Sequence, residues 1–431
     1  MLRVPEQTTP YGLWEITGAP RSEARRINGD VSTDIAIVGG GFCGLSAALH
    51  LAEAGLAPLV LEAQEPGFGA SGRNGGQVIA GIKLDPSELA VRFRPAEAEA
   101  LYRFGAGTAE TVFSLIERFQ IRCEAHRDGW IQAAHSPAML KAVRRRVTEL
   151  QDKGADVEWL DSEVIQRMIG TPYYKGGMID RRSGMVQPLS YARGLAGAAA
   201  SMGATILGNT PVRRLTRDGA AWRLETPGGT VLARHVLLAT NGYLGDLYPV
   251  LKTAMIVVQS YQIATEPLPP DLDRTVVPSR LPVSDLMDLG LYFRRDDAGR
   301  FIAGGGGSLT DKEEPALFHA LARSANILFP QLSETPFTSR WGGKLTLTRD
   351  HLPRVIELEP GLVAAYGCNG RGVALATVMG RLAAERIRGI THTDLPVAVM
   401  EPARYAFHNL RLPVMMTVRK FRRLRRRFAR A

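Results

Sequence analysis

The sequence predicts a mixed α/β fold, and three observations predict it. An apolar strand, a glycine-rich turn and an apolar helix follow one another over residues 33–54, which is the order of a βαβ unit. Helical patterns dominate residues 95–150, and short strands recur over 205–239 and 253–310. The 431 residues, 45% apolar and 22% charged, have the composition of a globular protein with a sizeable core, which excludes disordered and fibrous classes.

The elements can be placed in order along the chain. Residues 1–30 contain three prolines and are expected to form an irregular arm. Strands are expected at 33–38, 58–61, 205–207, 212–216, 222–225, 231–233, 235–239, 255–265, 291–295, 301–304 and 361–366. Helices are expected at 44–54, 188–203, 315–329 and 372–389 and over most of 95–150, with strand-like sequence at 123–132 and a proline-rich connector at 266–282.

The first glycine-rich turn has the spacing of a dinucleotide-binding motif. Gly39, Gly41 and Gly44 form GxGxxG after the buried strand, and the second strand leads to Glu62, 18 residues after Gly44. Gly39 permits the tight turn, Gly41 lets a pyrophosphate approach the helix N-terminus, and Gly44 lets the helix pack on the strand. Glu62 can accept hydrogen bonds from the adenosine ribose hydroxyls. The sequence therefore predicts a Rossmann-like nucleotide site.

Two further segments favour FAD over NAD, and the first of them is rich in glycine. One covers residues 67–77, directly after the Glu62 strand, and the other covers 237–242, at the end of a strand far downstream. A long, two-part cofactor needs close backbone approaches from several separated segments. Residues 304–307 lack the third spaced glycine and a following helix, so we expect no separate NAD(P)H site.

The cysteines and the lengths of the apolar runs indicate where in the cell the protein is expected. Cys43, Cys123 and Cys368 are too few and too widely spaced for a disulfide framework or a CxxC pair, and no metal site is expected. The first 30 residues lack a secretory signal, and no apolar run reaches the roughly 18 residues of a membrane-spanning helix. We therefore expect a cytoplasmic protein, either soluble or bound at the inner membrane surface.

The net charge of +10 comes almost entirely from residues 411–431, which contain nine basic residues and no acid, against 44 basic and 43 acidic residues elsewhere. Five apolar residues spaced by three and four would share one helix face: Val414, Val418, Phe421, Leu424 and Phe428. The near-neutral remainder argues against a nucleic-acid partner. Two interpretations stay open for this tail, which we place at 401–431: a helix bound to an anionic membrane surface and a solvated helix packed on the body.

Four strings carry a resemblance to a known family: Ser71-Gly72-Arg73-Asn74-Gly75-Gly76-Gln77, Tyr243-Leu244-Gly245-Asp246, Arg340-Trp341-Gly342-Gly343 and Cys368-Asn369-Gly370-Arg371-Gly372-Val373. With residues 34–62 and 239–242, the chain resembles the D-amino-acid oxidase (DAO), glycine oxidase and sarcosine oxidase superfamily of FAD oxidoreductases. Within that superfamily it resembles bacterial gamma-glutamylputrescine oxidases and L-pipecolate oxidases. The resemblance covers about residues 11–410, and the Ser-Gly-Arg-Asn-Gly-Gly-Gln string is its most specific part.

The resemblance implies a Rossmann-like FAD-binding domain interleaved with an antiparallel-sheet substrate domain. The FAD-binding domain would comprise residues 31–90, 155–245 and 355–400, and the substrate domain residues 91–154 and 246–354. The substrate-domain sheet would cover the flavin ring and exclude water. The strands expected over 253–310 agree with this arrangement.

The resemblance also implies which residues hold FAD. They are Gly39, Gly41, Phe42, Cys43, Gly44, Glu62, Ala63, Ser71, Arg73, Asn74, Gly75, Gln77, Val212, Thr240, Asn241, Gly242, Gly370, Arg371, Gly372 and Val373. Sarcosine-oxidase relatives attach their flavin through a cysteine just before a Tyr-Thr-x-Thr-like strand, but the comparable residues 340–350 contain no cysteine, so we expect non-covalent FAD. Putrescine-pathway members tend to have Ser-Gly-His-Gly where this chain has Asn369-Gly370-Arg371-Gly372, which leaves the substrate open.

The activity expected from the resemblance is oxidation of a C–N bond in a small amine or imino acid, such as gamma-glutamylputrescine or L-pipecolate, by hydride transfer to flavin N5. The electrons would pass to O₂ or a membrane quinone. Expected substrate contacts are Tyr261, Tyr292, Arg294, Trp341, Lys344 and Arg349, where aromatic rings would wall an amine and a cation would anchor a carboxylate. Core packing for the aromatic residues and solvation for the cations are the competing interpretations. The functional alternatives are a flavin enzyme acting on a modified tRNA base and a membrane-associated flavoprotein without turnover.

Overall fold

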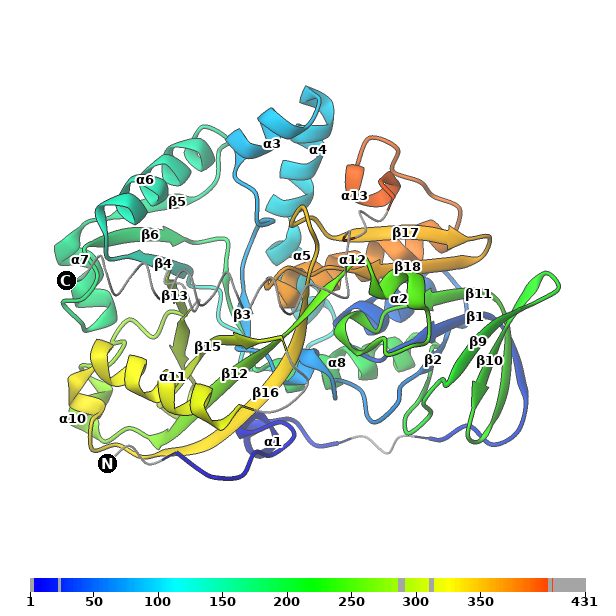
Figure 1. The fold of residues 1–431 in the computed structure, drawn as a ribbon, viewed down its shortest axis with the longest axis horizontal. Helices are drawn as coiled ribbons and strands as arrows, with labels where there is room; N and C mark the ends of the chain where they lie inside the picture. Colours follow the sequence, from blue (N-terminus) through cyan, green and yellow to red (C-terminus); the bar gives the residue numbers. More distant parts are fainter. Residues whose placement is uncertain (1–3, 22–24, 286–290, 310–313, 402–404, 406–431) are drawn as a thin grey trace.

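The computed structural model describes residues 4–21, 25–285, 291–309, 314–401 and 405. The described strands form two sheets of eight strands each and one small two-stranded sheet (Figure 1). The mixed α/β fold class expected from the sequence is confirmed.

The first sheet has the strand order β17-β18-β11-β1-β2-β8, with β10 pairing both β11 and β9. The strands are β1 (Val31–Val38), β2 (Leu59–Leu61), β8 (Thr205–Leu207), β9 (Arg214–Asp218), β10 (Ala221–Thr226), β11 (Gly229–Leu238), β17 (Arg354–Glu359) and β18 (Leu362–Tyr366). The pairs β2–β8, β1–β2, β1–β11 and β11–β18 are parallel. Their carboxyl ends therefore share one edge, where Gly39, Glu62, Ala239 and Gly367 follow directly.

Three apolar helices cover this sheet: α2 (Phe42–Glu53), α8 (Pro188–Ser201) and α12 (Gly372–Ile387). Helix α5 (Thr108–Arg118) packs on α12. Helix α2 packs against α8 and α12, and its buried residues include Leu45 and Leu49. Gly380 lets α12 approach closely, because a Cβ there would collide with the carbonyl oxygen of Cys43. The glycine-rich turn of residues 39–44 thus stands on a close-packed base.

The second sheet has the order β16-β12-β15-β14-β13-β4-β6-β5, and its pairs are antiparallel except β13–β4. Its strands are β4 (Trp130–Ala134), β5 (Val157–Leu160), β6 (Gly176–Asp180), β12 (Ile256–Pro267), β13 (Val283–Asp285), β14 (Tyr292–Arg295), β15 (Arg300–Ser308) and β16 (Phe337–Leu347). Helix α11 (Pro315–Leu328) packs on β12 and β15, and α6 (Pro137–Gln151) packs on β4, β5 and β6 (Figure 1).

Short elements join these layers. They are α1 (Leu13–Thr17), η1 (Ala70–Gly72), β3 (Gln77–Val78), α3 (Pro86–Arg92), α4 (Pro95–Ala106), α7 (Ser162–Ile169), β7 (Gly184–Met185), η2 (Asn241–Tyr243), α9 (Pro249–Lys252), α10 (Pro270–Asp273), η3 (Pro330–Leu332) and α13 (Pro396–Val399). Part of the N-terminal arm is buried, because Tyr11 and Trp14 pack against Phe68 and Trp341.

The structure differs from the expected elements in several places, three of which are instructive. Residues 157–180 supply β5 and β6 to the second sheet, although residues from 155 onward were expected with the first. Strand β16 was not expected, because Gly342 and Gly343 weaken its strand pattern, but pairing with β12 along its length overrides that weakness. The two strands expected over 231–239 are one, β11.

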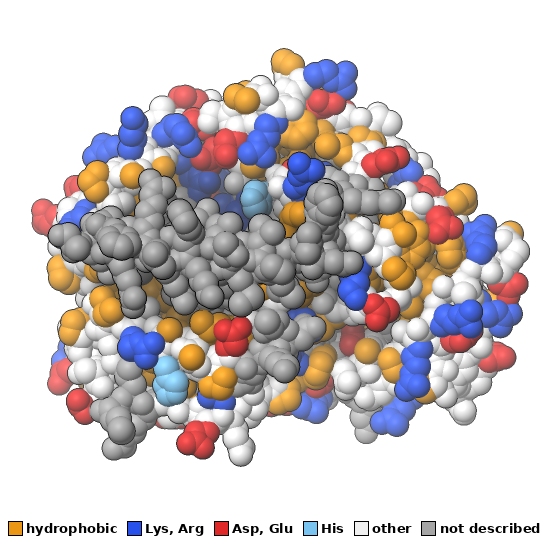
Figure 2. Space-filling view, viewed as in Figure 1, with side chains coloured by type: hydrophobic (Ala, Val, Ile, Leu, Met, Phe, Trp, Pro, Cys, Tyr) orange, Lys and Arg blue, Asp and Glu red, His pale blue; other side chains and the backbone are white. Residues whose placement is uncertain are grey.

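The basic tail lies outside the described residues, so the structure adds nothing to its two interpretations. On the described part of the face drawn in Figure 2, Lys and Arg side chains are interspersed with Asp and Glu. This matches the near balance of charges outside residues 411–431. No described helix is long and apolar enough to span a bilayer.

Candidate functional site

A cavity of about 770 Å³ lies where the carboxyl edge of the first sheet meets the second sheet. Its wall runs from Glu62 and Val212 past Gly41 and on to Gln132 and Tyr292. This volume lies toward the upper end of the roughly 300–1,000 Å³ usual for small-molecule and cofactor sites.

At one end, the start of α2 is open to a ligand. Its N-cap is Gly41, whose missing side chain leaves the helix without a side-chain cap. The Phe42 N–H donates to the Ser71 hydroxyl at 2.9 Å, and a Cβ on Gly41 would lie only 2.8 Å from that same oxygen. Free N–H groups and the helix dipole make this turn favourable for an anion such as a pyrophosphate.

Glu62 is buried beside this turn. Its two carboxylate oxygens accept hydrogen bonds from the Gly40 N–H at 2.6 Å and the Gln64 N–H at 3.0 Å. Burial nevertheless raises the pKa of Glu62, because desolvation outweighs these donors. Gly44 lies behind the turn, where a Cβ would collide with the Gly39 carbonyl oxygen, so this glycine is needed for close packing of helix on strand.

Residues 67–77 form a loop that is fixed by side chains from distant segments. Asn74 closes it by accepting from the Gly76 N–H at 2.7 Å and donating to two carbonyls of the η1 turn. The indole N–H of Trp14 donates to the Asn74 carbonyl at 2.9 Å, and that of Trp341 donates to the Arg73 carbonyl at 3.0 Å. The loop can therefore hold a set shape beside the cavity.

The far end of the cavity is a connected polar wall. The Trp130 indole N–H donates to the Ser284 hydroxyl at 3.1 Å, and Ser284 donates to Gln77 at 2.7 Å. Arg146 donates to Gln132 at 2.9 Å. Ser284 and Gln132 are register partners on β13 and β4, so the two sets of bonds adjoin on one face of the second sheet.

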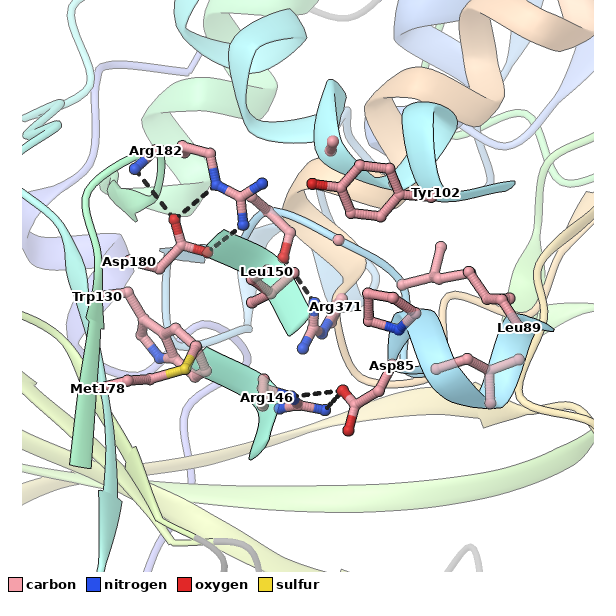
Figure 3. A pocket seen from close by; sticks show the side chains of 17 residues that line it. Asp85, Leu89, Tyr102, Trp130, Arg146, Leu150, Met178, Asp180, Arg182 and Arg371 are labelled. Atoms are coloured by element: carbon pink, nitrogen blue, oxygen red, sulfur yellow. Dashed lines mark hydrogen bonds and ion pairs between the residues drawn. The ribbon is translucent and has the colours of Figure 1, made fainter. Parts of the chain in front are cut away.

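A smaller cavity of about 40 Å³ adjoins this wall, and Figure 3 shows it. Arg146 pairs there with Asp85 at 2.5 Å, and Arg182 holds both oxygens of Asp180, at 2.9 and 2.7 Å. Arg371, the N-cap of α12, lies between these two pairs in this view and lines both cavities.

Tyr292 stands between two glycines on the cavity wall. A Cβ on Gly75 would lie 2.6 Å from its ring, and one on Gly304 would collide with it. Its hydroxyl lies 3.3 Å from that of Ser260, and burial raises the pKa of the phenol to about 12. The phenol therefore stays neutral at physiological pH.

The residues expected to hold the cofactor lie together on the cavity wall, except Gly44 and Gly242. Gly44 serves the packing described above. Gly242 lies beside Lys344, where a Cβ would be 3.2 Å from the lysine Cβ.

Of the six expected substrate contacts, only Tyr292 and Lys344 line the cavity. Tyr261 is fully buried, with its ring packed edge-on against Phe318. Arg294 is buried, and its guanidinium lies 5.0 Å from the Trp14 ring. Trp341 contacts the loop from behind, and Arg349 is exposed on a turn. These four side chains do not line the cavity.

Sequence reasoning did not single out seven polar or aromatic residues that line the cavity: Lys83, Trp130, Gln132, Arg146, Ser260, Gln262 and Ser284. They come from the segment after β3, from α6 and from β4, β12 and β13. No local motif marks them, because pairing within the second sheet brings them together. A weak signal was available in Lys83 and Gln132, which are polar residues within otherwise apolar runs.

The geometry fits a long dinucleotide that carries a second ring system. The glycine cradle and Glu62 suit a pyrophosphate and a ribose, and the wall continues past Ser71 and Gly370 toward the second sheet. Among the described residues, no cluster of three or more His, Cys, Asp or Glu side chains is arranged to hold a metal ion.

Comparison with known proteins agrees with this geometry. A family model described as "FAD dependent oxidoreductase" (DAO) matches residues 34–386. Gamma-glutamylputrescine oxidoreductase of Escherichia coli (strain K12) is 32% identical over 365 residues, covering 84% of this chain and 85% of that protein. Glycine oxidase of Bacillus licheniformis is 26% identical over 372 residues, covering 83% and 93% of the two chains.

Solved structures share the fold. The crystal structure of glycine oxidase from Geobacillus kaustophilus superposes with a TM-score of 0.73 at 22% identity, covering 87% of this chain and all of the other. L-proline dehydrogenase from P. horikoshii gives a TM-score of 0.71 at 18% identity, covering 85% and 96%. At these identities, the likeness shows the fold alone.

Proposed function

The chain belongs to the DAO family of FAD-dependent oxidoreductases, and from that premise we propose that it oxidises the C–N bond of a small amine or imino acid in the 770 Å³ cavity. FAD is its cofactor, and amines and amino acids are the substrate class of its relatives. Gamma-glutamylputrescine and L-pipecolate are the specific candidates, the first because it is named in the 32% identical relative.

The observation that carries the proposal is the continuity of the cavity. One end has the open start of α2 and the buried Glu62, which suit the pyrophosphate and ribose of FAD. The other end is closed by polar and aromatic side chains of the second sheet, including Gln132 and Tyr292. A substrate bound there would lie between the flavin and that sheet.

The chemistry that bound FAD would supply is acceptance of the hydride from the carbon bearing the nitrogen. The substrate nitrogen loses a proton, and the resulting imine is hydrolysed to a carbonyl compound or remains as a cyclic imine. The chain supplies orientation and a site shielded from water, with Tyr292 as a neutral wall and Gln132 as a hydrogen-bonding group. The start of α12 at Gly372 would place its positive dipole end toward the flavin and favour negative charge there.

The test is anaerobic flavin reduction by a panel of candidates: L-pipecolate, L-proline, sarcosine, gamma-glutamylputrescine, putrescine and D-amino acids. At least one amine should bleach the flavin absorbance without any added macromolecule. A flavin that bleaches only when a tRNA is supplied, or with no member of the panel, would overturn the proposal.

A further inference from the structure

Residues 11–19 of the N-terminal arm form a strap across the two parts of the fold. They precede the residues that the family model matches, which begin at 34. Helix α1 within the strap has only five residues, too few to be stable without tertiary contacts. Its buried side chains, Leu13 and Trp14, share one apolar cluster with residues of α8 and of the second sheet: Leu189, Ala264, Ile302 and Trp341.

The strap is held in one conformation by its backbone. Gly12 has a φ of +55°, and a Cβ there would lie 2.2 Å from the indole of Trp341, so only glycine fits. The Gln187 side chain at the start of α8 donates to the Trp14 carbonyl at 3.0 Å and to the Thr17 hydroxyl at 3.1 Å. The strap therefore docks in a defined place between α8 and β16.

Trp14 connects the strap to the loop of residues 67–77. Its indole N–H donates to the Asn74 carbonyl at 2.9 Å, and the Asn74 side chain closes the loop. Arg73, Asn74 and Gly75 line the large cavity, whereas Trp14 lies behind them. A loop that is ordered before its ligand arrives spares the ligand the entropy of ordering it. The strap is thus placed to act on FAD through the loop.

Arg294 ties the strap and the loop together from the second sheet. Its guanidinium lies 5.0 Å from the centroid of the Trp14 ring, and a Cβ on Gly76 would lie 3.2 Å from it. The Nε and Nη2 atoms have no hydrogen-bond partner among the described residues. Burial lowers the pKa of Arg294 to about 10, although three nearby acidic side chains oppose this shift, so the group is charged at neutral pH. The aromatic ring is therefore a main stabilising contact of a buried cation.

We propose that the strap is a cofactor-retention element, whose docking and the binding of FAD stabilise each other. Trp14 is its positioning residue, because it fixes residues 73–75 of the loop without contacting the cavity. Coupling of this kind is reciprocal: the factor by which the docked strap tightens FAD binding is the factor by which FAD tightens docking. The proposal rests on FAD as the cofactor and is independent of which amine is oxidised.

The first experiment dialyses the holoenzyme against graded concentrations of free FAD and measures the retained flavin by absorbance. Trp14→Phe keeps a ring for Arg294 but loses the hydrogen bond, so the FAD dissociation constant should rise about 3- to 10-fold. Trp14→Ala loses both contacts, and its rise should be about 30- to 150-fold. Ile16→Ala is the matched control, because this side chain of the same helix is 74% exposed, and its constant should stay within about twofold of wild type.

The second experiment follows amide hydrogen exchange by mass spectrometry in the full chain. In wild type, residues 11–19 should exchange more slowly at saturating FAD than at a concentration that leaves most sites empty, by the Trp14→Ala factor within about threefold. Strand β11 is the internal reference and should change less. At saturating FAD, Trp14→Phe should speed exchange in residues 67–77.

FAD dissociation constants within about twofold of wild type in both Trp14 variants, even with a lower melting temperature, would overturn the proposal and leave the strap a structural role. If Trp14→Ala is not recovered as holoenzyme, Trp14→Phe decides by itself. Strap exchange that does not depend on FAD would overturn the coupling. A weaker affinity in Trp14→Phe without faster exchange in residues 67–77 would overturn the route through the loop. None of these measurements uses an amine, so they stand apart from the test of the proposed function.

Discussion

The two ends of the cavity are built in different ways. At the nucleotide end, Gly39, Gly41 and Glu62 lie within 24 consecutive residues and act largely through backbone groups and one carboxylate. At the substrate end, Lys83, Gln132 and Tyr292 come from separate segments and act through their side chains.

This difference predicts how substitutions at each end affect cofactor binding and substrate selectivity. A site made of backbone groups tolerates few side chains, because a Cβ occupies the space of the ligand or of a neighbouring strand. A site made of side chains on a rigid sheet can change specificity without loss of the cofactor. We therefore expect substitutions at the two ends to separate flavin content from substrate selectivity.

The largest expected effect is at the nucleotide end. Gly41→Val would place a branched side chain against the Ser71 hydroxyl and over the open start of α2, so FAD content of the purified protein should fall below about a tenth of wild type. The flavin-to-protein absorbance ratio measures this. Gly197→Val is the matched control, because a Cβ at this α8 position meets nothing within 4 Å, and it should keep full flavin.

A smaller effect is expected at Glu62. Glu62→Gln keeps the shape but removes the charge that receives the ribose hydroxyls, so the FAD dissociation constant should rise about 10- to 100-fold. Bound hydroxyl donors favour the carboxylate, whereas burial raises the pKa of the free group. Wild-type affinity for FAD should therefore fall as the pH drops through that pKa, and fluorescence titration of released FAD should find no such fall in Glu62→Gln.

Trp341 sharpens the distinction between contacting and positioning residues. Trp341→Phe removes the hydrogen bond to the Arg73 carbonyl behind the loop, so the FAD dissociation constant should rise about 3- to 10-fold. With FAD saturating, KM for the amine should stay within about twofold of wild type. A large rise in KM at saturating FAD would place the indole in contact with substrate.

The smallest effect is expected at Arg349. Its side chain is exposed on the turn after β16 and does not line the cavity. Arg349→Met should therefore change kcat/KM for a carboxylate-bearing amine by less than about twofold in steady-state assays. A tenfold loss would restore Arg349 as the carboxylate anchor.

How much the sequence could predict follows the same division. GxGxxG, Glu62 and the loop of residues 67–77 are contiguous patterns with a fixed mechanism, and the structure places them on the cavity wall as expected, with Gly44 behind it. The substrate end could not be predicted in this way, because the strand partners of β4 and β13 decide that Gln132 and Ser284 share a face. Tyr261 and Trp341 are aromatic residues of the kind that could line an amine site. They lie behind the cavity wall instead, because Tyr261 packs against Phe318 and Trp341 packs against the loop of residues 67–77.

The most direct test of the central claim is a stoichiometry. The holoenzyme is mixed without oxygen with the amine of the panel that reduces it fastest, and the reduced flavin and the carbonyl or cyclic imine product are both quantified. Oxidation of a C–N bond in this cavity predicts one product molecule for each flavin reduced. A flavin that stays oxidised with every amine, or one that is reduced without a product of this kind, would contradict the account.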